Sequence, residues 1–390
     1  MVQIFDSEFF SMVWPDSPIA YLVLGVTIFL LMLNFTIRAL EFVALKRRSK
    51  CAEGKESRFE NPSEGVSVII TVNNNAELIS KNLPRFLEQD YPDYEVIVVD
   101  EASDDDSVDR LNILAAKYPN LKVSRLYPGV KFHRTKKIAL NIGILGARNE
   151  ILLFSEIYCT PPSQSWVREM ASSFSDRCGV VIGDSSYPVT NRLVDLLRWN
   201  HNMHRINAAF LNFFGYIPGC DWTNYGYRKS LYMACRGFSK NNQHILGYES
   251  EIILKILHGF AHTVAFNRSE NGTVLYSDDR HQLRADEEYY YVEKRHWPAG
   301  IRLLSDIAQW VRFLVYCAII VLNPLFGFAY WFVTALFILT FFVDFLCINL
   351  QMSSMLQKKL FLTSLMSTTI GYFGRWCYRI KTLVSESQWK

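Results

Sequence analysis

The stretch that decides the fold runs from Val66 to Asp104 and reads VSVIITVNNNAELISKNLPRFLEQDYPDYEVIVVDEASD. It begins with a β-branched run, Val66 to Val72, that leads into three asparagines, Asn73 to Asn75. Such a run predicts a buried strand followed by a loop. Apolar residues then recur at helical spacing from Leu78 to Leu87, and after a turn comes a second apolar run, Tyr94 to Val99.

Two apolar strands joined by a helix form a βαβ unit, which predicts a parallel sheet. Ligands of such sheets bind at the carboxyl ends of the strands. Asn73 to Asn75 and Asp100 to Ser103 lie at those ends. The residues alone therefore predict a ligand edge that carries an acid, Asp100. The alternative for Asp100 is a solvated acid at the end of a strand.

The pattern of strands and helices continues through the middle of the chain. We expect further strands at 121–126, 150–154 and 179–183, and helices at 107–118, from 135, at 192–214 and at 252–257. The expected fold class is α/β, with a mostly parallel central sheet flanked by helices.

The composition indicates a membrane-associated protein. The chain has 390 residues, enough for one large domain with appendages or for two domains. Its hydrophobic content of 50% and aromatic content of 14% are high for a fully soluble protein. The net charge of +3 is small and the basic residues are dispersed, so we expect no nucleic-acid partner. The eight cysteines form no CxxC pair, which favours reduced thiols over disulfides.

The segment Ser17 to Ile37 has no charge and is long enough to cross a membrane as a helix. The basic run Lys46-Arg47-Arg48-Ser49-Lys50 follows it, and basic flanks stay on the cytoplasmic side. A signal peptide would carry its basic residues before the apolar run. We therefore expect a main domain that faces the cytoplasm at the inner (plasma) membrane.

A second apolar region, Phe313 to Asn349, is too long for one straight span and predicts two helices that turn near Gly327. Its one charge, Asp344, should face a partner or a cavity, and Arg312 is a candidate partner. Residues 358–377 predict an interfacial helix on the cytoplasmic face, with a third C-terminal span as the weaker alternative.

Four parts follow from these patterns. We expect an N-terminal transmembrane helix with its basic flank at 1–50, a linker at 51–65, the main domain at 66–300 and a C-terminal membrane region at 301–390.

The stretch from Val66 to Asp104 resembles the first half of an inverting, processive-type family 2 glycosyltransferase domain. Members of that family have an Asn-containing loop after the first strand, a Gln-Asp-Tyr-Pro-like turn and a second strand that ends in Val-Asp-Asp-x-Ser. The similarity extends over most of the chain. It implies a GT-A-like fold and a nucleotide-sugar donor, with Asp100 on the base and with Asn74 and Ser103 in the loops against the nucleotide.

The resemblance also implies a role for Lys136, which opens a helix together with Lys137. A lysine at this position in the family sits near the donor phosphates. An ammonium suits a diphosphate as a mobile point charge, and a helix N-terminus favours anions. The alternative is two surface lysines at the start of a helix.

The family holds Mg²⁺ or Mn²⁺ with two aspartates in the motif Thr-Asp-Ala-Asp-Cys-x-Pro. Here the corresponding residues are Ser155 to Pro161, with Glu156 in the first acidic position and Tyr158 in the second. Hard cations prefer carboxylate oxygens, and a neutral phenol is a poor ligand. The resemblance therefore implies Glu156 as the single protein ligand of a metal cofactor.

The general base of the family is the last acid in a Gly-acid-acid motif before a Leu-rich helix. By direct alignment with Gly247 to Glu251 this position is Ser250, which cannot accept the proton. Glu249 and Glu251 flank it and are the candidate catalytic bases. The alternative is that both acids only favour the helix N-terminus.

A family motif Gln-x-x-Arg-Trp corresponds to Glu293-x-x-His296-Trp297. The resemblance implies that Trp297 contacts the acceptor and that Arg295 and His296 bind the donor diphosphate. Glu293 brings a negative charge to the position of a neutral amide, and the charge of His296 depends on pH.

Two functions are in view. The first is sugar transfer from a nucleotide-diphosphate donor to a lipid-linked or polysaccharide acceptor, in contact with membrane lipids. The second is a catalytically impaired pseudo-glycosyltransferase that scaffolds or regulates a partner protein in glycan assembly. The changes at the metal site, the base and the diphosphate clamp favour this alternative. A transporter is a weaker reading, because few spans are available to enclose a path.

Overall fold

The computed structural model describes residues 18–53, 64–127, 136–187, 192–217, 222–238, 248–260, 263–267, 269–276, 289–325, 330–355, 377 and 380. The chain divides into two compact units. The sheet unit comprises Arg47–Val194 and Ile217–His296. The helical unit comprises Met1–Lys46, Asp195–Tyr216 and Trp297–Lys390.

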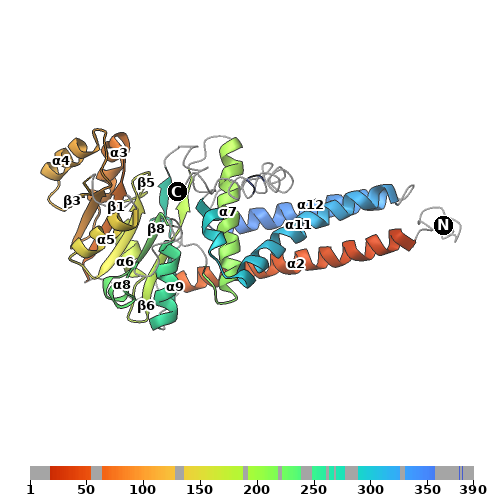
Figure 1. The fold of residues 1–390 in the computed structure, drawn as a ribbon. Coiled ribbons are helices and arrows are strands. Elements are labelled where there is room, and N and C mark those ends of the chain that lie inside the picture. The colour runs from red at the N-terminus through yellow and green to blue at the C-terminus, as the bar shows by residue number, and fades with distance from the viewer. Residues whose placement is uncertain are drawn as a thin grey trace. The chain divides into compact units, whose positions relative to one another are not determined.

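The sheet unit is built on a seven-stranded sheet in the order β3-β2-β1-β4-β8-β6-β9 (Figure 1). Its strands are β1 Val66–Val72, β2 Tyr94–Asp100, β3 Leu121–Arg125, β4 Ile151–Glu156, β6 Cys178–Gly183, β8 Asn224–Arg228 and β9 Thr263–Asn267. All pairings are parallel except the two that β8 makes, with β4 and β6. The predicted α/β class with a mostly parallel sheet is confirmed.

A second sheet of three short strands has the order β5-β10-β7. The strands are β5 Cys159–Thr160, β7 Ser185–Ser186 and β10 Val274–Tyr276. The sequence pattern did not predict them, because two or three residues are too few to show an alternation.

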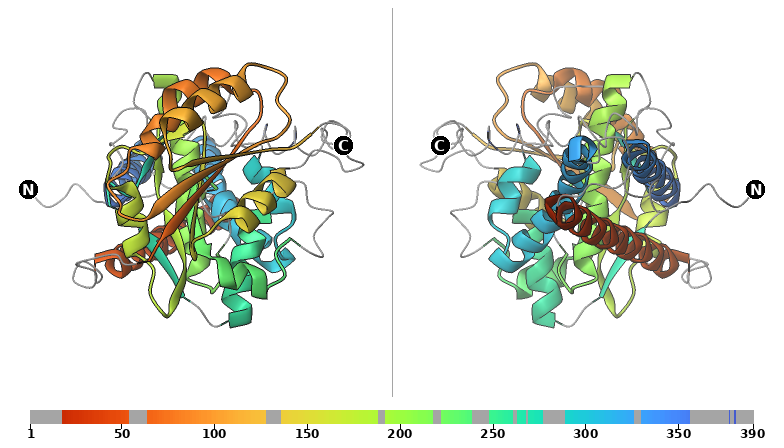
Figure 2. Two further views of the ribbon diagram at one scale, coloured as in Figure 1. Left: turned by 90° about the vertical axis from the view of Figure 1, so that its left-hand side faces the viewer. Right: turned by 90° about the vertical axis from the view of Figure 1, so that its right-hand side faces the viewer.

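Helices cover both faces of the large sheet. They are α3 Ala76–Leu87, α4 Ser107–Lys117, α5 Lys136–Gly146, α6 Trp166–Ser172, α8 Lys229–Ala234 and α9 Tyr248–Phe260. In the sheet, β2 and β3 follow one another outward on one side of β1, and the chain then crosses back to add β4 on the other side of β1. Right-handed crossovers therefore place α3 and α4 on one face and α5 on the other, as Figure 2 shows. Close packing of α5 on β1 requires Gly143, where a Cβ would lie 2.7 Å from a methyl group of Ile69.

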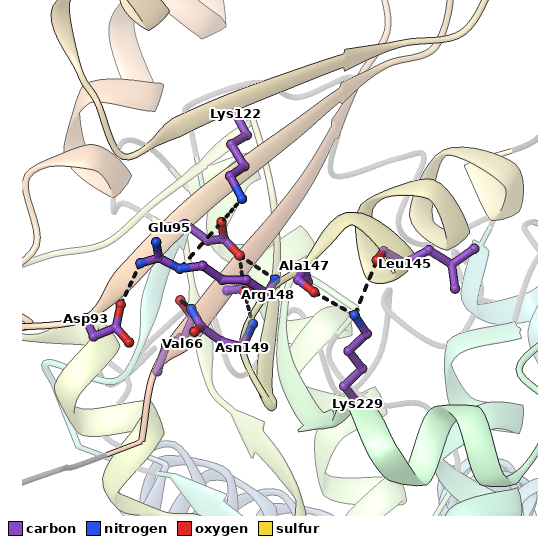
Figure 3. A network of polar contacts seen from close by, with 10 residues as sticks. Val66, Asp93, Glu95, Lys122, Leu145, Ala147, Arg148, Asn149 and Lys229 are labelled. Atoms are coloured by element: carbon purple, nitrogen blue, oxygen red, sulfur yellow. Dashed lines mark hydrogen bonds and ion pairs between the residues drawn. The ribbon is translucent and has the colours of Figure 1, made fainter.

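A polar network joins the strands at their amino ends, opposite to the predicted ligand edge (Figure 3). The Glu95 carboxylate is 2% exposed and accepts hydrogen bonds from the Ser67 hydroxyl at 2.7 Å and the Arg148 amide at 2.8 Å. The Lys122 ammonium lies 2.6 Å from its other oxygen. Burial raises the pKa of Glu95. Lys122 and the two hydrogen bonds lower it by more than burial raises it, so the pKa lies below the usual value for a glutamate.

This network predicts a pH dependence of stability. An unfolded glutamate titrates near pH ~4.3, and the folded pKa of Glu95 is lower, so the unfolded state binds more protons in that range. Glu95 therefore adds to the free energy of unfolding at pH values above that range, and this stabilisation is lost as the pH falls through it. We expect Glu95→Gln to lower the thermal unfolding temperature at neutral pH and to lose this difference in acid. Glu77→Gln, a change at an exposed acid, should show no such pH dependence.

The helical unit contains α11 Ala299–Leu325, α12 Tyr330–Ser354 and most of α2 Pro18–Glu53 and α7 Arg192–Asn212, whose remaining residues belong to the sheet unit. Three segments are long and apolar enough to cross a membrane: Pro18–Lys46, Ala299–Leu322 and Val333–Ser354. They agree with the expected spans. The first helix continues through Glu53, into the segment where we expected a linker. The predicted interfacial helix at 358–377 lies outside the described residues except at 377.

A cluster of buried charges joins α2, α11 and α12, which we call the bundle charge cluster: Arg38, Glu41, Arg312, Tyr316, Asp344 and Gln351. The Arg38 guanidinium lies 3.1 Å from Asp344, and the Tyr316 hydroxyl donates to the same carboxylate at 2.6 Å. Arg312 forms an ion pair with Glu41. The expectation that Arg312 pairs with Asp344 is therefore wrong, because Arg38 and Tyr316 take both carboxylate oxygens of Asp344.

Candidate functional site

The loops after β1 and β2 meet at the carboxyl edge of the sheet, because β1 and β2 pair up to the register Val72↔Asp100. Asp100, the last residue of β2, is fully buried. The Ser103 hydroxyl donates to Asp100 Oδ1 at 2.5 Å, and the Ser103 amide lies 3.3 Å from each carboxylate oxygen. The Arg125 guanidinium lies 3.3 Å from Asp100 Oδ2. Asp100 thus orders the loop that follows it.

Asn74 connects the first loop to the second. Its amide donates to the Ser103 hydroxyl at 2.9 Å, and its side-chain oxygen accepts from the Asp104 amide at 2.9 Å. The backbone of Asn74 is left-handed, with φ of 53°, a conformation that asparagine adopts more readily than most residues. The structure therefore brings together Asn74, Asp100 and Ser103, the three residues predicted to lie against the nucleotide.

The second part of the edge is an ion pair between α5 and β4. Lys136 is the first residue of α5, and Glu156 is the last residue of β4. The Lys136 ammonium contacts Glu156 Oε1. The Lys136 side chain is 31% exposed, whereas the Glu156 side chain is 9% exposed. The lysine is therefore the more exposed partner of this ion pair.

Two further acids, Glu101 and Glu249, act on this pair. Burial lowers the pKa of Lys136, but Glu156, Glu249 and Glu101 together raise it above the usual value, so the ammonium stays charged. Burial raises the pKa of Glu156 against the opposing effect of Lys136. Burial likewise raises the pKa of Glu101. We call Lys136, Glu101, Glu156 and Glu249 the edge cluster.

The residues at the predicted metal position do not fit a divalent ion held by the protein. The ammonium of Lys136 engages one carboxylate oxygen of Glu156. Tyr158, in the second acidic position, stacks on Tyr276 at 5.9 Å between ring centroids, and Tyr276 stacks on Tyr187 at 4.0 Å. Over the described parts of the chain, no group of three His, Cys, Asp or Glu side chains is arranged to hold a metal ion. The metal role of Glu156 stays a prediction from the sequence.

The two candidate bases have different surroundings, although both lie in the first turn of α9. Glu249 is 4% exposed, belongs to the edge cluster, and accepts a hydrogen bond from the Tyr289 hydroxyl at 2.5 Å. The Tyr289 ring in turn packs on Trp222, with ring centroids 4.2 Å apart. Glu251 is 31% exposed and lies 3.6 Å from the Lys255 ammonium, four residues along the helix. Glu249 thus lies near enough to Lys136 to raise its pKa, whereas Glu251 pairs with a lysine of its own helix.

Three predicted residues, Arg295 to Trp297, lie at the end of the helical segment 289–295. Arg295 is half-buried, and His296 is exposed. Trp297 is 5% exposed and packs edge-on against Tyr216, with ring centroids 6.1 Å apart. Arg295 and His296 belong to the sheet unit and Trp297 to the helical unit. Their roles toward donor and acceptor stay predictions.

Glu101 and Tyr289 were not among the site residues predicted from the sequence. Glu101 could have been predicted, because it directly follows Asp100 at the end of a strand, where ligands of parallel sheets bind. Tyr289 had no local signal, because its contact with Glu249 spans 40 residues. Asn224 is fully buried in the sheet unit: its side-chain nitrogen donates to the carbonyl oxygens of Asp184 and Gly272, and its side-chain oxygen accepts from the Trp166 indole.

Comparison with known proteins gives a consistent fold. Residues 67–235 match the family model "Glycosyl transferase family 2". A mannosyltransferase from Pyrobaculum calidifontis, solved in complex with GDP-Man and Mn²⁺, is similar over 94% of this chain and 100% of its own, with TM-score 0.59 and 16% identity. A glucosyl-3-phosphoglycerate synthase from Mycobacterium tuberculosis, solved with Mn²⁺, UDP and phosphoglyceric acid, covers 59% of this chain and 77% of its own, with TM-score 0.40 and 16% identity. No curated protein matches the sequence.

Proposed function

We propose, on the premise that residues 67–235 belong to glycosyl transferase family 2, that this chain transfers a sugar from a nucleotide-diphosphate donor to a lipid-linked or polysaccharide acceptor. The transfer takes place at a membrane and inverts the configuration of the anomeric carbon. The observation that carries the proposal is at the carboxyl edge of the sheet, where the buried Glu249 accepts a hydrogen bond from Tyr289 and the ammonium of Lys136 pairs with Glu156.

Each residue of the edge has a role in this reaction. Glu249 accepts the proton of the acceptor hydroxyl, and Tyr289 orients its carboxylate. The deprotonated oxygen attacks the anomeric carbon from the face opposite to the leaving group. The bond from that carbon to the diphosphate breaks, and the nucleoside diphosphate leaves with the electron pair. The Lys136 ammonium stabilises the negative charge that develops on the diphosphate.

The donor class has support from structures of similar fold. The mannosyltransferase from Pyrobaculum calidifontis was solved with GDP-Man, and its fold matches nearly all of this chain. Asp100 and the loops that it orders lie at the edge where such sheets bind nucleotides. We assign Asp100 to the base, with Asn74 and Ser103 beside it, and Arg295 and His296 to the diphosphate.

The acceptor class and the location follow from the helical unit. Three helices are long and apolar enough to cross a membrane. The basic residues that follow the first span support a sheet unit on the cytoplasmic side, and we propose that the membrane is the inner (plasma) membrane. A lipid-linked acceptor lies in that membrane, and Trp297 is our candidate for contact with it.

Nucleotide binding tests the donor site. We expect wild-type protein in detergent to bind UDP or GDP in calorimetric titrations, and Asp100→Asn to weaken that binding by roughly tenfold or more, since a charge-assisted hydrogen bond contributes about 1.5–3 kcal/mol. Asp93→Asn, a change at an exposed acid at the opposite end of β2, is the matched control and should bind as the wild type does. Equal affinity of Asp100→Asn and wild type would remove Asp100 from the donor site.

A second candidate function is the pseudo-glycosyltransferase that scaffolds a partner in glycan assembly. The observations that favour it are Tyr158 at the second metal position, stacked on Tyr276, and Ser250 at the aligned position of the base. It predicts no sugar transfer by the purified chain from UDP- or GDP-sugars to lipid extracts, whereas the leading function predicts transfer.

A further inference from the structure

The cation at the centre of the edge cluster belongs to the chain itself. Lys136 forms an ion pair with Glu156, and Glu101 and Glu249 lie close enough to act on its charge. These acids come from the end of β2, the end of β4 and the start of α9. The acid that holds this ammonium, Glu156, is the one that the sequence predicts as the metal ligand, so the lysine occupies the place expected for a divalent ion.

The second position of the metal motif is closed to a hard cation. Tyr158 is half-buried, and its ring stacks on Tyr276, which stacks on Tyr187. A neutral phenol is a poor ligand for Mg²⁺ or Mn²⁺. The phenol removes one negative charge from this position, and the ammonium of Lys136 engages the carboxylate that remains, Glu156.

We propose that the Lys136 ammonium takes the place of the divalent ion, so that this chain binds the diphosphate of its donor without metal. This inference rests on the proposed function, because it concerns the donor of that reaction. It replaces the metal role that the sequence predicts for Glu156 with a structural one, in which Glu156 holds the ammonium in position.

The geometry suits this role. An ammonium has three N–H donors, and the contact with Glu156 uses one side of it. The lysine side chain is 31% exposed and that of Glu156 is 9% exposed, so the lysine is the partner of the pair that solvent reaches more easily. Lys136 also begins α5, an 11-residue helix, and its N-terminus adds positive potential toward a phosphate.

Calorimetric titration of the full chain in detergent tests the inference. UDP and GDP are each titrated in EDTA and in Mn²⁺, and Mn²⁺ alone is followed by electron paramagnetic resonance. We expect the wild type to bind one nucleotide equally well in EDTA and in Mn²⁺, and the signal of free Mn²⁺ to stay unchanged when protein is added. Lys136→Met should weaken binding in EDTA by roughly tenfold or more, as expected for the loss of a charge-assisted hydrogen bond.

A matched control exists in the same sheet. Lys122 also neutralises a buried glutamate, Glu95, but at the opposite edge, with its ammonium 2.6 Å from the carboxylate. Lys122→Met should lower thermal stability and leave nucleotide binding unchanged. Thermal unfolding of both variants separates loss of binding from loss of fold, and the wild-type comparison of EDTA with Mn²⁺ needs no variant.

The possible failures are distinguishable. Nucleotide binding by the wild type that requires Mn²⁺ would overturn this inference and leave the proposed function standing. Unchanged binding by Lys136→Met in EDTA would do the same. A wild type that binds neither UDP nor GDP under either condition would overturn the proposed function, and the inference with it.

Discussion

Glu249→Gln is expected to lower the rate of sugar transfer by about 100- to 10,000-fold, the usual contribution of a general base. The physical reason is that the amide cannot accept the proton of the acceptor hydroxyl, although it keeps the shape of the side chain and its contact with Tyr289. The measurement is transfer of labelled sugar from UDP- or GDP-sugar donors to lipid acceptors by the purified chain. Binding of UDP or GDP should change little, because this base acts on the acceptor.

Glu251→Gln is the matched control. The two acids share the first turn of α9, and the substitution is chemically identical. Glu251 is partly exposed and lies near Lys255, so its loss should change the transfer rate by only a few-fold. Inactivation by Glu251→Gln with an active Glu249→Gln would reverse our assignment. Equal glycan production by both variants and the wild type in cells would favour the pseudo-glycosyltransferase.

Asp344→Asn is expected to destabilise the helical unit by about 3–5 kcal/mol, because it leaves two buried guanidinium groups, Arg38 and Arg312, with one carboxylate, Glu41. Arg38 and Asp344 are each under 4% exposed and lie on helices that are apolar enough to cross a membrane. The measurement is thermal unfolding in detergent, together with the fraction of protein that elutes as one homogeneous species.

The double variant Arg38→Met with Asp344→Leu removes both charges. We expect it to be less destabilised than the sum of the single changes, since replacing a buried pair by apolar side chains avoids an uncompensated charge. Asp93→Asn, which breaks the exposed ion pair with Arg148, should cost less than about 1 kcal/mol and serves as the control. If the double variant loses as much stability as the two single variants together, Arg38 and Asp344 do not stabilise each other.

Much of the sheet unit could be predicted from local pattern. The predicted strands that begin at Val66, Tyr94 and Leu121 agree with the structure to within two residues. Each is an apolar run ended by polar residues, and burial on both faces of a parallel sheet produces such runs. The meeting of Asn74 with Ser103 was also predictable, because the carboxyl ends of adjacent parallel strands lie side by side.

Tertiary structure alone decided the choice between Glu249 and Glu251. Residues two apart on a helix point about 200° apart around its axis, so the sequence already implied that both could not face one site. Which of them faces the edge depends on how α9 packs on the sheet. The structure places Glu249 against Tyr289 and beside Lys136, which are far from it in sequence.

For the charged residues of the helical unit, too, the sequence predicted one part and the tertiary structure decided the other. Hydropathy alone predicted the apolar spans, because a membrane helix needs a long run without charge. It also marked Asp344 as a residue that must have a partner. The identity of that partner, Arg38 rather than Arg312, depends on the rotation of three helices about their axes, and the contact spans 306 residues. Local sequence carries the periodicity of each helix, whereas the pairing of one helix face with another arises only when the bundle is packed.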